Sequence, residues 1–419
     1  MQNQANNKRQ DQRIAIIGAG AAGLVAAESL KNKGYKHITL FEKNDHVGGK
    51  CRTEKINGKP FELGAGIVAG TDLIVMRLAK KYRTPLQCIP FGKSIHIDEK
   101  TGRELPKMSW PKKILLLKQI FFTYRRLLRT YKTVSKPGFT SLDSELSIPF
   151  SRFAAKYHIE ALAKEFKLFF TGFGYGYFED ISTAYVLKYI SWNTIKSFVK
   201  RRVYFFPEGI QYLWASVAQS HDVRFNTNIQ SITRDKVITI VTDKEEFVFD
   251  SLILTSPLDE ALKFLQPTKQ ERQLFSKISY TDYRTVACRV TGLDKMNGFI
   301  PDNYSASKIG SPVFFNRRFA NSNVYTFYVL ADGRSVDDKA VQNVTNLVEK
   351  MGGVVKKVYS VTRWKYFPHV DSVTMKNGYF DALEAIQGAN HTFYVGELMS
   401  FSTVGLTSEY ADDLVERFF

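Results

Sequence analysis

Cysteine is scarce in this chain. Its 419 residues include three cysteines, Cys51, Cys88 and Cys288, which lie far apart and form no C-x-x-C pair. A disulfide framework and a structural zinc site both need clustered cysteines, so the sequence argues against a small secreted scaffold and against a zinc-folded module. We therefore expect no metal site.

Long hydrophobic runs are also missing. The longest, Ile114–Leu117 and Ile120–Phe122, are interrupted by Lys118 and fall short of the roughly 20 apolar residues that a membrane-spanning helix needs. Residues 1–13 are polar and lack the apolar core of a signal peptide. These absences predict a cytoplasmic protein in a reducing compartment, with a peripheral position at the inner membrane surface left open.

Acidic residues are outnumbered by basic ones. The chain has 59 lysines and arginines against 41 aspartates and glutamates, which gives a formal net charge of +18. This charge favours an anionic partner, whether nucleic acid, a membrane surface or an acidic substrate. We rate nucleic acid lowest, because no recognised nucleic-acid-binding motif accompanies the charge. The hydrophobic fraction of 44% excludes a disordered chain, and the length indicates two or more packed units.

The strongest pattern lies near the N-terminus. An apolar run, Ile14–Ile17, is suited to a strand buried on both faces. Residues 18–23 follow with the spacing G-x-G-x-x-G, then a predicted helix over Leu24–Lys31 and a second predicted strand, His37–Phe41. This order is the βαβ unit of a dinucleotide-binding domain.

The spacing of the glycines has a physical cause. Gly18 permits a tight turn, Gly20 lets the backbone approach a pyrophosphate, and Gly23 allows the helix to pack closely on the strand. The N-terminus of the helix then presents free N–H groups to the phosphates. Glu42, at the end of the second strand, is placed to accept a hydrogen bond from a ribose hydroxyl, which disfavours a 2′-phosphate and therefore NADP.

Five further segments follow this start in a characteristic order. They are residues 45–53, with a paired glycine before basic residues, the Glu-Leu-Gly-Ala box at 62–66, and residues 206–211, 250–257 and 392–397. Together they resemble the signatures of the flavin amine oxidase superfamily, which implies an α/β fold with a Rossmann-type FAD-binding domain of the GR2 type. The implied cofactor is non-covalent FAD, since residues 396–404 contain no cysteine for covalent attachment. The candidate FAD-binding residues are Gly18, Gly20, Ala22, Gly23, Glu42, Lys43, Gly49, Lys50, Gly64, Ala65, Gly66, Glu397 and Val404.

The same resemblance predicts a discontinuous organisation. We expect a disordered N-terminus at 1–12, and an FAD-binding domain assembled from residues 13–89, 205–287 and 376–419. Residues 90–204 are rich in Leu, Phe, Tyr, Lys and Arg with a mostly helical period, which predicts a helical cover. Residues 288–375 contain strand-like runs and predict the mixed sheet of a substrate domain.

One stretch of the predicted cover, residues 103–136, contains a single acid, Glu104. Its apolar residues recur at steps of three and four, and its cations fall on another face of the helix. The apolar set is Ile114, Leu117, Phe121, Tyr124, Leu128 and Tyr131, and the cations are Lys118, Arg125, Arg129 and Lys132. Such a helix either buries its apolar face on the protein or meets anionic lipid headgroups, in which case residues 196–202 would extend the basic face.

Further strings resemble a narrower family. They are residues 46–51, 172–178, 184–189, 366–370 and 394–401, together with the C-terminal tail at 413–419. They are similar to the bacterial FAD-dependent polyunsaturated fatty acid isomerases, which form conjugated linoleic acid. The resemblance implies that FAD takes a hydride from a bis-allylic carbon and returns it to another carbon, with no net redox change.

The resemblance also implies substrate-site residues. Phe173 and Phe198 occupy positions where the family uses phenylalanines around the acyl chain. The family holds the fatty-acid carboxylate with an arginine, in a segment that here contains Lys93 and no arginine. Lys93 is therefore the candidate carboxylate anchor, as a point charge without the bidentate fork of arginine.

Two other functions remain open from the sequence alone. An amine-oxidase-like or desaturating FAD oxidoreductase would act on a hydrophobic substrate and pass electrons to oxygen or a carrier. A lipid-binding flavoprotein would retain FAD structurally without turnover. The sequence predicts no oligomeric state.

Overall fold

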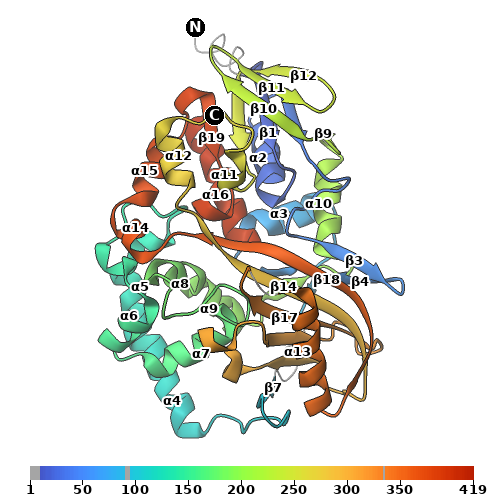
Figure 1. Ribbon diagram of the computed structural model, residues 1–419. Coiled ribbons are helices and arrows are strands. Elements are labelled where there is room, and N and C mark those ends of the chain that lie inside the picture. The colour runs from blue at the N-terminus through green and yellow to red at the C-terminus, as the bar shows by residue number, and fades with distance from the viewer. Residues whose placement is uncertain (1–9, 90–94, 334–335) are drawn as a thin grey trace.

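A five-stranded parallel sheet forms the centre of the FAD-binding half of the molecule (Figure 1). The computed structural model describes residues 10–89, 95–333 and 336–419. The strands of this sheet come from distant parts of the chain. In spatial order they are β19 (Thr392–Tyr394), β13 (Ser251–Leu254), β1 (Arg13–Ile17), β2 (His37–Phe41) and β9 (Asp222–Arg224). All four pairings are parallel, which places the carboxyl ends of the strands at one edge of the sheet.

Helices cover one face of this sheet and a small antiparallel sheet lies against the other. The helices are α2 (Ala21–Asn32), α3 (Leu73–Lys81), α10 (Ile210–Ala218) and α16 (Val404–Phe418), which pack on one another. The small sheet consists of β10 (Ile229–Arg234), β11 (Ile238–Thr242) and β12 (Glu246–Phe249). Phe41 of β2 contacts the rings of Phe247 and Phe249, which joins the two sheets. The parallel strands are therefore buried on both faces, as their continuous apolar runs predict.

A six-stranded sheet forms the other half. In spatial order its strands are β18 (Val354–His369), β14 (Ser279–Thr291), β17 (Val324–Ala331), β16 (Pro312–Asn316), β15 (Asn297–Phe299) and β7 (Ile95–His96). Successive side chains of a strand point to opposite faces. Val286 and Cys288 of β14 therefore pack against α13 (Asp337–Lys350), whereas Tyr283 faces an aromatic cluster on the other side.

A layer of short helices closes the second half (Figure 1). They are α4 (Trp110–Lys118), the π-helical turn η1 (Gln119–Tyr124), α5 (Arg125–Thr130), α6 (Phe150–Lys156), α7 (Glu160–Phe170), α8 (Thr183–Tyr189) and α9 (Trp192–Val199). The predicted α/β fold, with a Rossmann-type domain, a mixed sheet and a helical cover, is confirmed.

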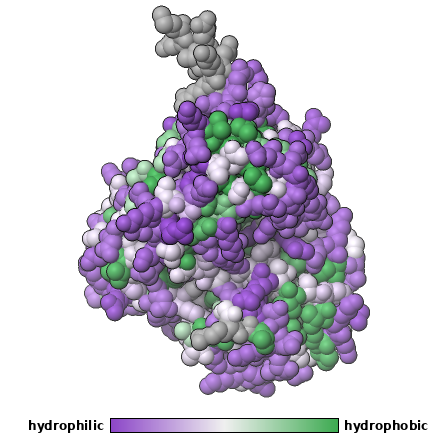
Figure 2. All heavy atoms as spheres, turned by 45° about the horizontal axis from the view of Figure 1, so that its top comes forward, coloured by the Kyte–Doolittle hydropathy of each residue, from purple (hydrophilic) through white to green (hydrophobic). Residues whose placement is uncertain are grey.

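Two small sheets connect the halves. One is the hairpin of β3 (Thr53–Ile56) and β4 (Lys59–Glu62), and the other pairs β5 (Ile67–Ala69) and β6 (Gln87–Cys88) with β8 (Val203–Phe205). Strand β14 begins at Ser279 and so crosses the segment boundary predicted at 287–288. The face in Figure 2 is mostly hydrophilic, with hydrophobic side chains in small separate areas.

Two kinds of feature are absent from the described residues, 10–89, 95–333 and 336–419. No helix there is long and apolar enough to cross a membrane. In the same ranges, no group of three or more His, Cys, Asp or Glu side chains is placed to hold a metal ion.

Candidate active site

The turn between β1 and α2 is built from close backbone contacts. Gly18 adopts a φ of +105°, a conformation that side-chain-bearing residues rarely take. A Cβ atom on Gly23 would lie 2.0 Å from the carbonyl oxygen of Gly18. Helix α2 can therefore begin directly above the end of the strand only because both positions are glycine.

Gly20 caps α2 and faces open space. A Cβ atom there would come no nearer than 3.8 Å to any other part of the protein, at Cα of Gly49. No side chain caps the helix, and its first turn contains no acidic residue. The first N–H groups of α2 therefore remain free for an anionic ligand. Ala22, in the same turn, is buried.

Glu42 is held beside this turn at the end of β2. Its side chain is buried, and its carboxylate accepts hydrogen bonds from the backbone N–H groups of Ala19 and Asn44, each at 3.0 Å. The Asn44 side-chain amide donates a further bond to Oε1 at 2.7 Å. These bonds fix the carboxylate next to the glycine turn and leave a free lone pair on Oε2 for a ribose hydroxyl.

The glycine-containing segments 45–53 and 62–66 are joined to the turn at residues 18–23 through backbone contacts. Gly48 N–H donates to Ala19 at 2.9 Å, and a Cβ on Gly49 would lie 3.3 Å from Cα of Gly20. Ala65 N–H donates to the carbonyl of Lys50 at 3.0 Å. Adding a Cβ to Gly64 would place it 2.0 Å from that same oxygen.

The C-terminal segment, residues 396–404, contacts these glycine-containing segments through an ion pair. Lys50 Nζ donates to Glu397 Oε2 at 2.7 Å, and Ser402 Oγ donates to the same oxygen at 2.9 Å. Val404 begins α16 and is buried, and the Thr403 hydroxyl caps that helix by accepting from Leu406 N–H. Three distant parts of the chain thus meet around Gly20, Lys50 and Glu397.

Two of the predicted residues lie away from this meeting point, and a third is outside the described part of the chain. Lys43 is exposed. Gly66 lies against the side chain of Glu62, where a Cβ would approach Cγ to 2.4 Å. Lys93 lies outside the described residues.

A continuous series of aromatic rings begins beside the Lys50–Glu397 pair, and we call it the aromatic wall. It comprises Tyr189, Phe401, Tyr175, Tyr366, Tyr283, Tyr328, Phe314, Phe173, Phe169 and Phe198. At its inner end the rings of Tyr189 and Phe401 stack at 5.1 Å, and Tyr175 stacks on Tyr366 at 5.4 Å. The ammonium of Lys50 lies 5.6 Å from the centre of the Tyr366 ring, which joins the wall to the glycine boxes.

The wall continues along the six-stranded sheet. Tyr366 stacks on Tyr283 at 5.2 Å, and Tyr283 stacks on Tyr328 at 5.9 Å. Phe314 then lies 5.5 Å from both Tyr328 and Phe173. These rings stand on neighbouring strands and point to the same face, because residues two apart on a strand share a side.

The outer end of the wall belongs to the helical cover. Phe173 lies 6.3 Å from Phe169, and Phe169 lies 5.2 Å from Phe198 of α9. Both predicted substrate residues, Phe173 and Phe198, are half-buried. The structure therefore places them on one connected surface rather than in separate parts of the core.

Three tyrosines of the aromatic wall are half-buried and have pKa values raised by burial. Burial raises the pKa values of Tyr189, Tyr366 and Tyr328 well above the ordinary value for a phenol. Each nevertheless retains accessible surface and is only half-buried. Their raised pKa values keep these phenols uncharged.

The sequence patterns contained most of this wall without identifying it. Only Phe173 and Phe198 were predicted, yet Tyr175, Tyr189 and Tyr366 lie in three of the family-like strings. The signal that could have found them is the convergence of these strings on one aromatic cluster. Tyr283, Tyr328 and Phe314 lie outside every such string, so only the sheet register reveals them.

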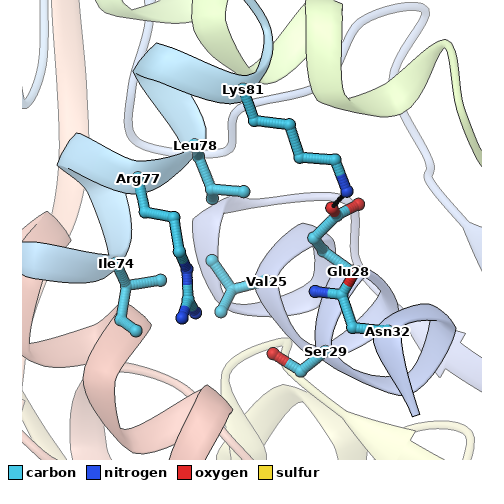
Figure 3. Close-up of a pocket in the computed structure, with 8 residues that line it drawn as sticks. All are labelled: Val25, Glu28, Ser29, Asn32, Ile74, Arg77, Leu78 and Lys81. Carbon is cyan, nitrogen blue, oxygen red and sulfur yellow. Dashed lines mark hydrogen bonds and ion pairs between the residues drawn. The ribbon is translucent and has the colours of Figure 1, made fainter.

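A separate surface cavity of about 220 Å³ lies between α2 and α3 (Figure 3). Glu28 is buried there and accepts hydrogen bonds from Lys81, from Tyr82 at 2.8 Å and from His221 at 3.1 Å. Arg77, which also lines this cavity, pairs with Asp412 at 3.5 Å. The charged groups that line this cavity, Glu28, Arg77 and Lys81, are all in ion pairs, so we assign it to the packing of the helices.

The family model for flavin-containing amine oxidoreductases matches residues 21–384. The crystal structure of a CLA-producing fatty acid isomerase from P. acnes superimposes with a TM-score of 0.92 at 31% identity, over 98% of this chain and 99% of that one. A beta-cyclopiazonate dehydrogenase from Aspergillus flavus is 24% identical over 96% of this chain and 92% of its own length. A putrescine oxidase structure shares the fold alone, with a TM-score of 0.74 at 14% identity over 97% of this chain and 98% of that one.

Proposed function

From the premise that this chain belongs to the flavin-containing amine oxidoreductase family, we propose that it is an FAD-dependent isomerase of polyunsaturated fatty acids. It would move one double bond of a linoleic-type acid into conjugation. The observation that carries the proposal is the aromatic wall, which starts at the Lys50–Glu397 pair and ends at Phe198. Its likeness to the fatty acid isomerase of P. acnes supports the choice of substrate class.

FAD is the cofactor of this family, and the residues present fit it. Gly20 leaves open the space that a pyrophosphate would occupy at the uncapped start of α2. Glu42 supplies a buried carboxylate for the ribose, and the Lys50–Glu397 pair borders the path from that site to the aromatic wall. These residues would hold the phosphates and the adenosine ribose of FAD at the start of α2.

When bound, FAD supplies an acceptor that takes a hydride from a bis-allylic carbon and returns it to an end of the same pentadienyl unit, without net redox change. The chain's own residues do the rest. The wall excludes water from a cationic pentadienyl group, and its ring faces stabilise that charge. Because burial keeps the phenols of Tyr189 and Tyr366 protonated, the wall brings no anion that could add to the carbocation.

Binding of the acyl chain would fall to the outer part of the wall. Phe173 and Phe198 would contact the chain, and Lys93 would hold the carboxylate as a single charge. Lys93→Gln should then raise KM for free linoleic acid with little change in kcat, while KM for methyl linoleate stays unchanged. An equal effect on both substrates would remove Lys93 from this role.

The proposal is tested with the purified, FAD-loaded full chain and free linoleic acid under anaerobic conditions. We expect absorbance in the conjugated-diene band to rise while the flavin spectrum stays oxidised. Chromatography of the products from a panel of free fatty acids would then establish regiochemistry and preferred chain length.

Three other outcomes would overturn the proposal. Bleaching of the flavin by the fatty acid, followed by oxygen consumption on admission of air, would identify a desaturating oxidoreductase. Hydrogen peroxide release with an amine and no new diene would identify an amine oxidase. Tight fatty-acid binding without any turnover would favour a lipid-binding flavoprotein.

A further inference from the structure

Helix α4 leaves most of its apolar residues exposed, although Leu116 is half-buried against the core. None of its residues, Trp110–Lys118, is buried. Trp110 is 75% exposed and Leu117 54%, and Phe122 in the following turn is 74% exposed. Burial increases toward the C-terminal end of this stretch, because Tyr124 of η1 and Leu127 of α5 are buried in the core. The apolar stripe predicted from the sequence therefore divides, since only its C-terminal half covers the protein.

The exposed half carries charge of one sign. Its cations, with those of the adjoining η1–α5 segment, are Lys112, Lys113, Lys118, Arg125, Arg126 and Arg129. Among the residues that the structure describes, no carboxylate forms an ion pair with any of them, and the nearby Glu145 is paired with Lys156. The Lys113 ammonium lies 4.8 Å from the centre of the Trp110 ring, so cation and apolar surface alternate on one side of the helix.

The exposed surface continues onto α9, which carries the last ring of the aromatic wall. Phe121 contacts Trp192 at 5.8 Å, and the Arg125 guanidinium lies 4.9 Å from the centre of the same indole. Val199, at the end of α9, is 70% exposed. We call the exposed side of α4 and η1, together with Trp192 and Val199, the docking face. It lies at the corner of the molecule where α4 projects (Figure 1).

Charge and hydrophobicity together select the occupant of this face. A twofold dimer would place the cations of one copy against the same cations of the other, which is unfavourable. Nucleic acid would neutralise the charge but leave Trp110 and Phe122 in water. An anionic bilayer satisfies both, because indole and aliphatic side chains enter the headgroup boundary while lysines and arginines meet the phosphates.

We propose that the docking face binds the surface of an anionic lipid bilayer. The face lies beside Phe198, so a bound molecule presents the outer end of its aromatic wall to the lipid. An acyl chain could then pass from the membrane to the wall without crossing bulk water, a consequence that rests on the proposed function. Membrane binding itself does not depend on the proposed function, because it is measured without turnover.

The test is co-sedimentation of the FAD-loaded full chain with vesicles of phosphatidylcholine alone or mixed with phosphatidylglycerol. We expect binding to the mixed vesicles that weakens as salt increases. The double variants Trp110→Ser/Phe122→Ser and Lys112→Glu/Lys113→Glu should each lower the partition coefficient about tenfold or more. Val373→Ser is the matched control, since Val373 is 69% exposed on another helix, α14 (Ser372–Lys376), and its loss should change nothing.

Flavin loading and circular dichroism establish that each variant is folded before its binding is compared. Equal partition onto neutral and anionic vesicles, or no partition at all, would overturn the proposal. An equal loss of binding in the Val373→Ser control would overturn the assignment to this face. A concentration-dependent dimer that the Trp110→Ser/Phe122→Ser variant abolishes would identify the occupant as a second copy instead.

Discussion

The candidate site has two parts, a cofactor cradle and the aromatic wall, and they differ in whether backbone or side chains form the contacts. The phosphate-binding part of the cofactor cradle consists of backbone, with Gly18, Gly20, Gly23 and Gly49 at positions where a single Cβ would disturb the fold or obstruct the ligand. The aromatic wall consists of side chains from the sheet and the helical cover, held by ring contacts of about 5 to 6 Å. A backbone site tolerates almost no substitution, whereas a site made of side chains can be altered one ring at a time. The difference explains how one family can keep its cofactor and change its substrate.

The largest effect should come from Gly20→Val. The protein has room for the new side chain, whose Cβ comes no nearer than 3.8 Å, so the fold should persist while the pyrophosphate space is filled. We expect complete loss of FAD, measured by flavin absorbance after gel filtration. Gly333→Val is the control, because a Cβ there would also meet nothing closer than 3.8 Å. A folded Gly20→Val protein with one FAD per chain would place the phosphates elsewhere.

Acid should weaken the cofactor half. Burial alone would raise the pKa of Glu28 on α2, but hydrogen bonds from His221, Lys81 and Tyr82 lower it to about 2. Because the folded pKa lies below the unfolded value of 4.5, Glu28 stabilises the fold above that pH. Up to about 3 kcal/mol should be lost as the pH falls from about 5 to 2. Urea unfolding across this range measures the loss, and Glu28→Gln should flatten it; an unchanged slope would contradict the assignment.

Removal of a central ring should slow turnover while FAD stays bound. Tyr366→Leu interrupts the wall next to Lys50, and we expect kcat on linoleic acid to fall about 10- to 30-fold, or about 2 kcal/mol. Tyr366→Phe keeps the ring and should retain most of the rate. The raised pKa of Tyr366 keeps its phenol neutral, so loss of the hydroxyl removes no charge from the wall. Both rates follow from diene absorbance. If Tyr366→Phe is as slow as Tyr366→Leu, the hydroxyl and not the ring is required.

The smallest effect should come from the outer end of the wall. Phe198→Ala removes the ring that contacts Phe169, so the acyl chain should be positioned less tightly. We expect a change of a few-fold in turnover, with a broader set of positional isomers on chromatography. Phe225→Ala, at a surface position that is 37% exposed, serves as the control. Identical products and rates for both variants would remove Phe198 from the site.

The cofactor half could be predicted because its constraints are local. The order of Ile14–Ile17, the three glycines and His37–Phe41 appears in the structure as β1, the turn, α2 and β2. Backbone geometry requires glycine at fixed spacing, so the spacing itself carries the information. The helix differs from prediction only in its ends, which extend to Ala21 and Asn32.

The wall could not be predicted because its order in space is not its order in sequence. Tyr283 and Tyr328 meet because β14 pairs with β17 in a register that places Tyr283 opposite Leu330. In a chain with 53 tyrosines and phenylalanines, no spacing rule separates these rings from core packing. The division of the basic stripe was equally hidden, because Ile114 and Leu128 follow the same period and only the tertiary contacts decide which is buried.

Strands β14 and β18 are paired from Ser279 opposite His369 to Thr291 opposite Val354, and they cross from the cofactor half to the far edge of the second sheet (Figure 1). Backbone pairing along this ladder joins the two halves, with irregular register between Ser279 and Thr281 and between Ala287 and Val290. On the proposed function, we expect the product to leave by sliding lengthwise along the rings, because the aromatic wall runs from Tyr366 to Phe198. Release should then slow steadily with each added methylene of the acyl chain, and the residence time of the product would measure the length of the passage.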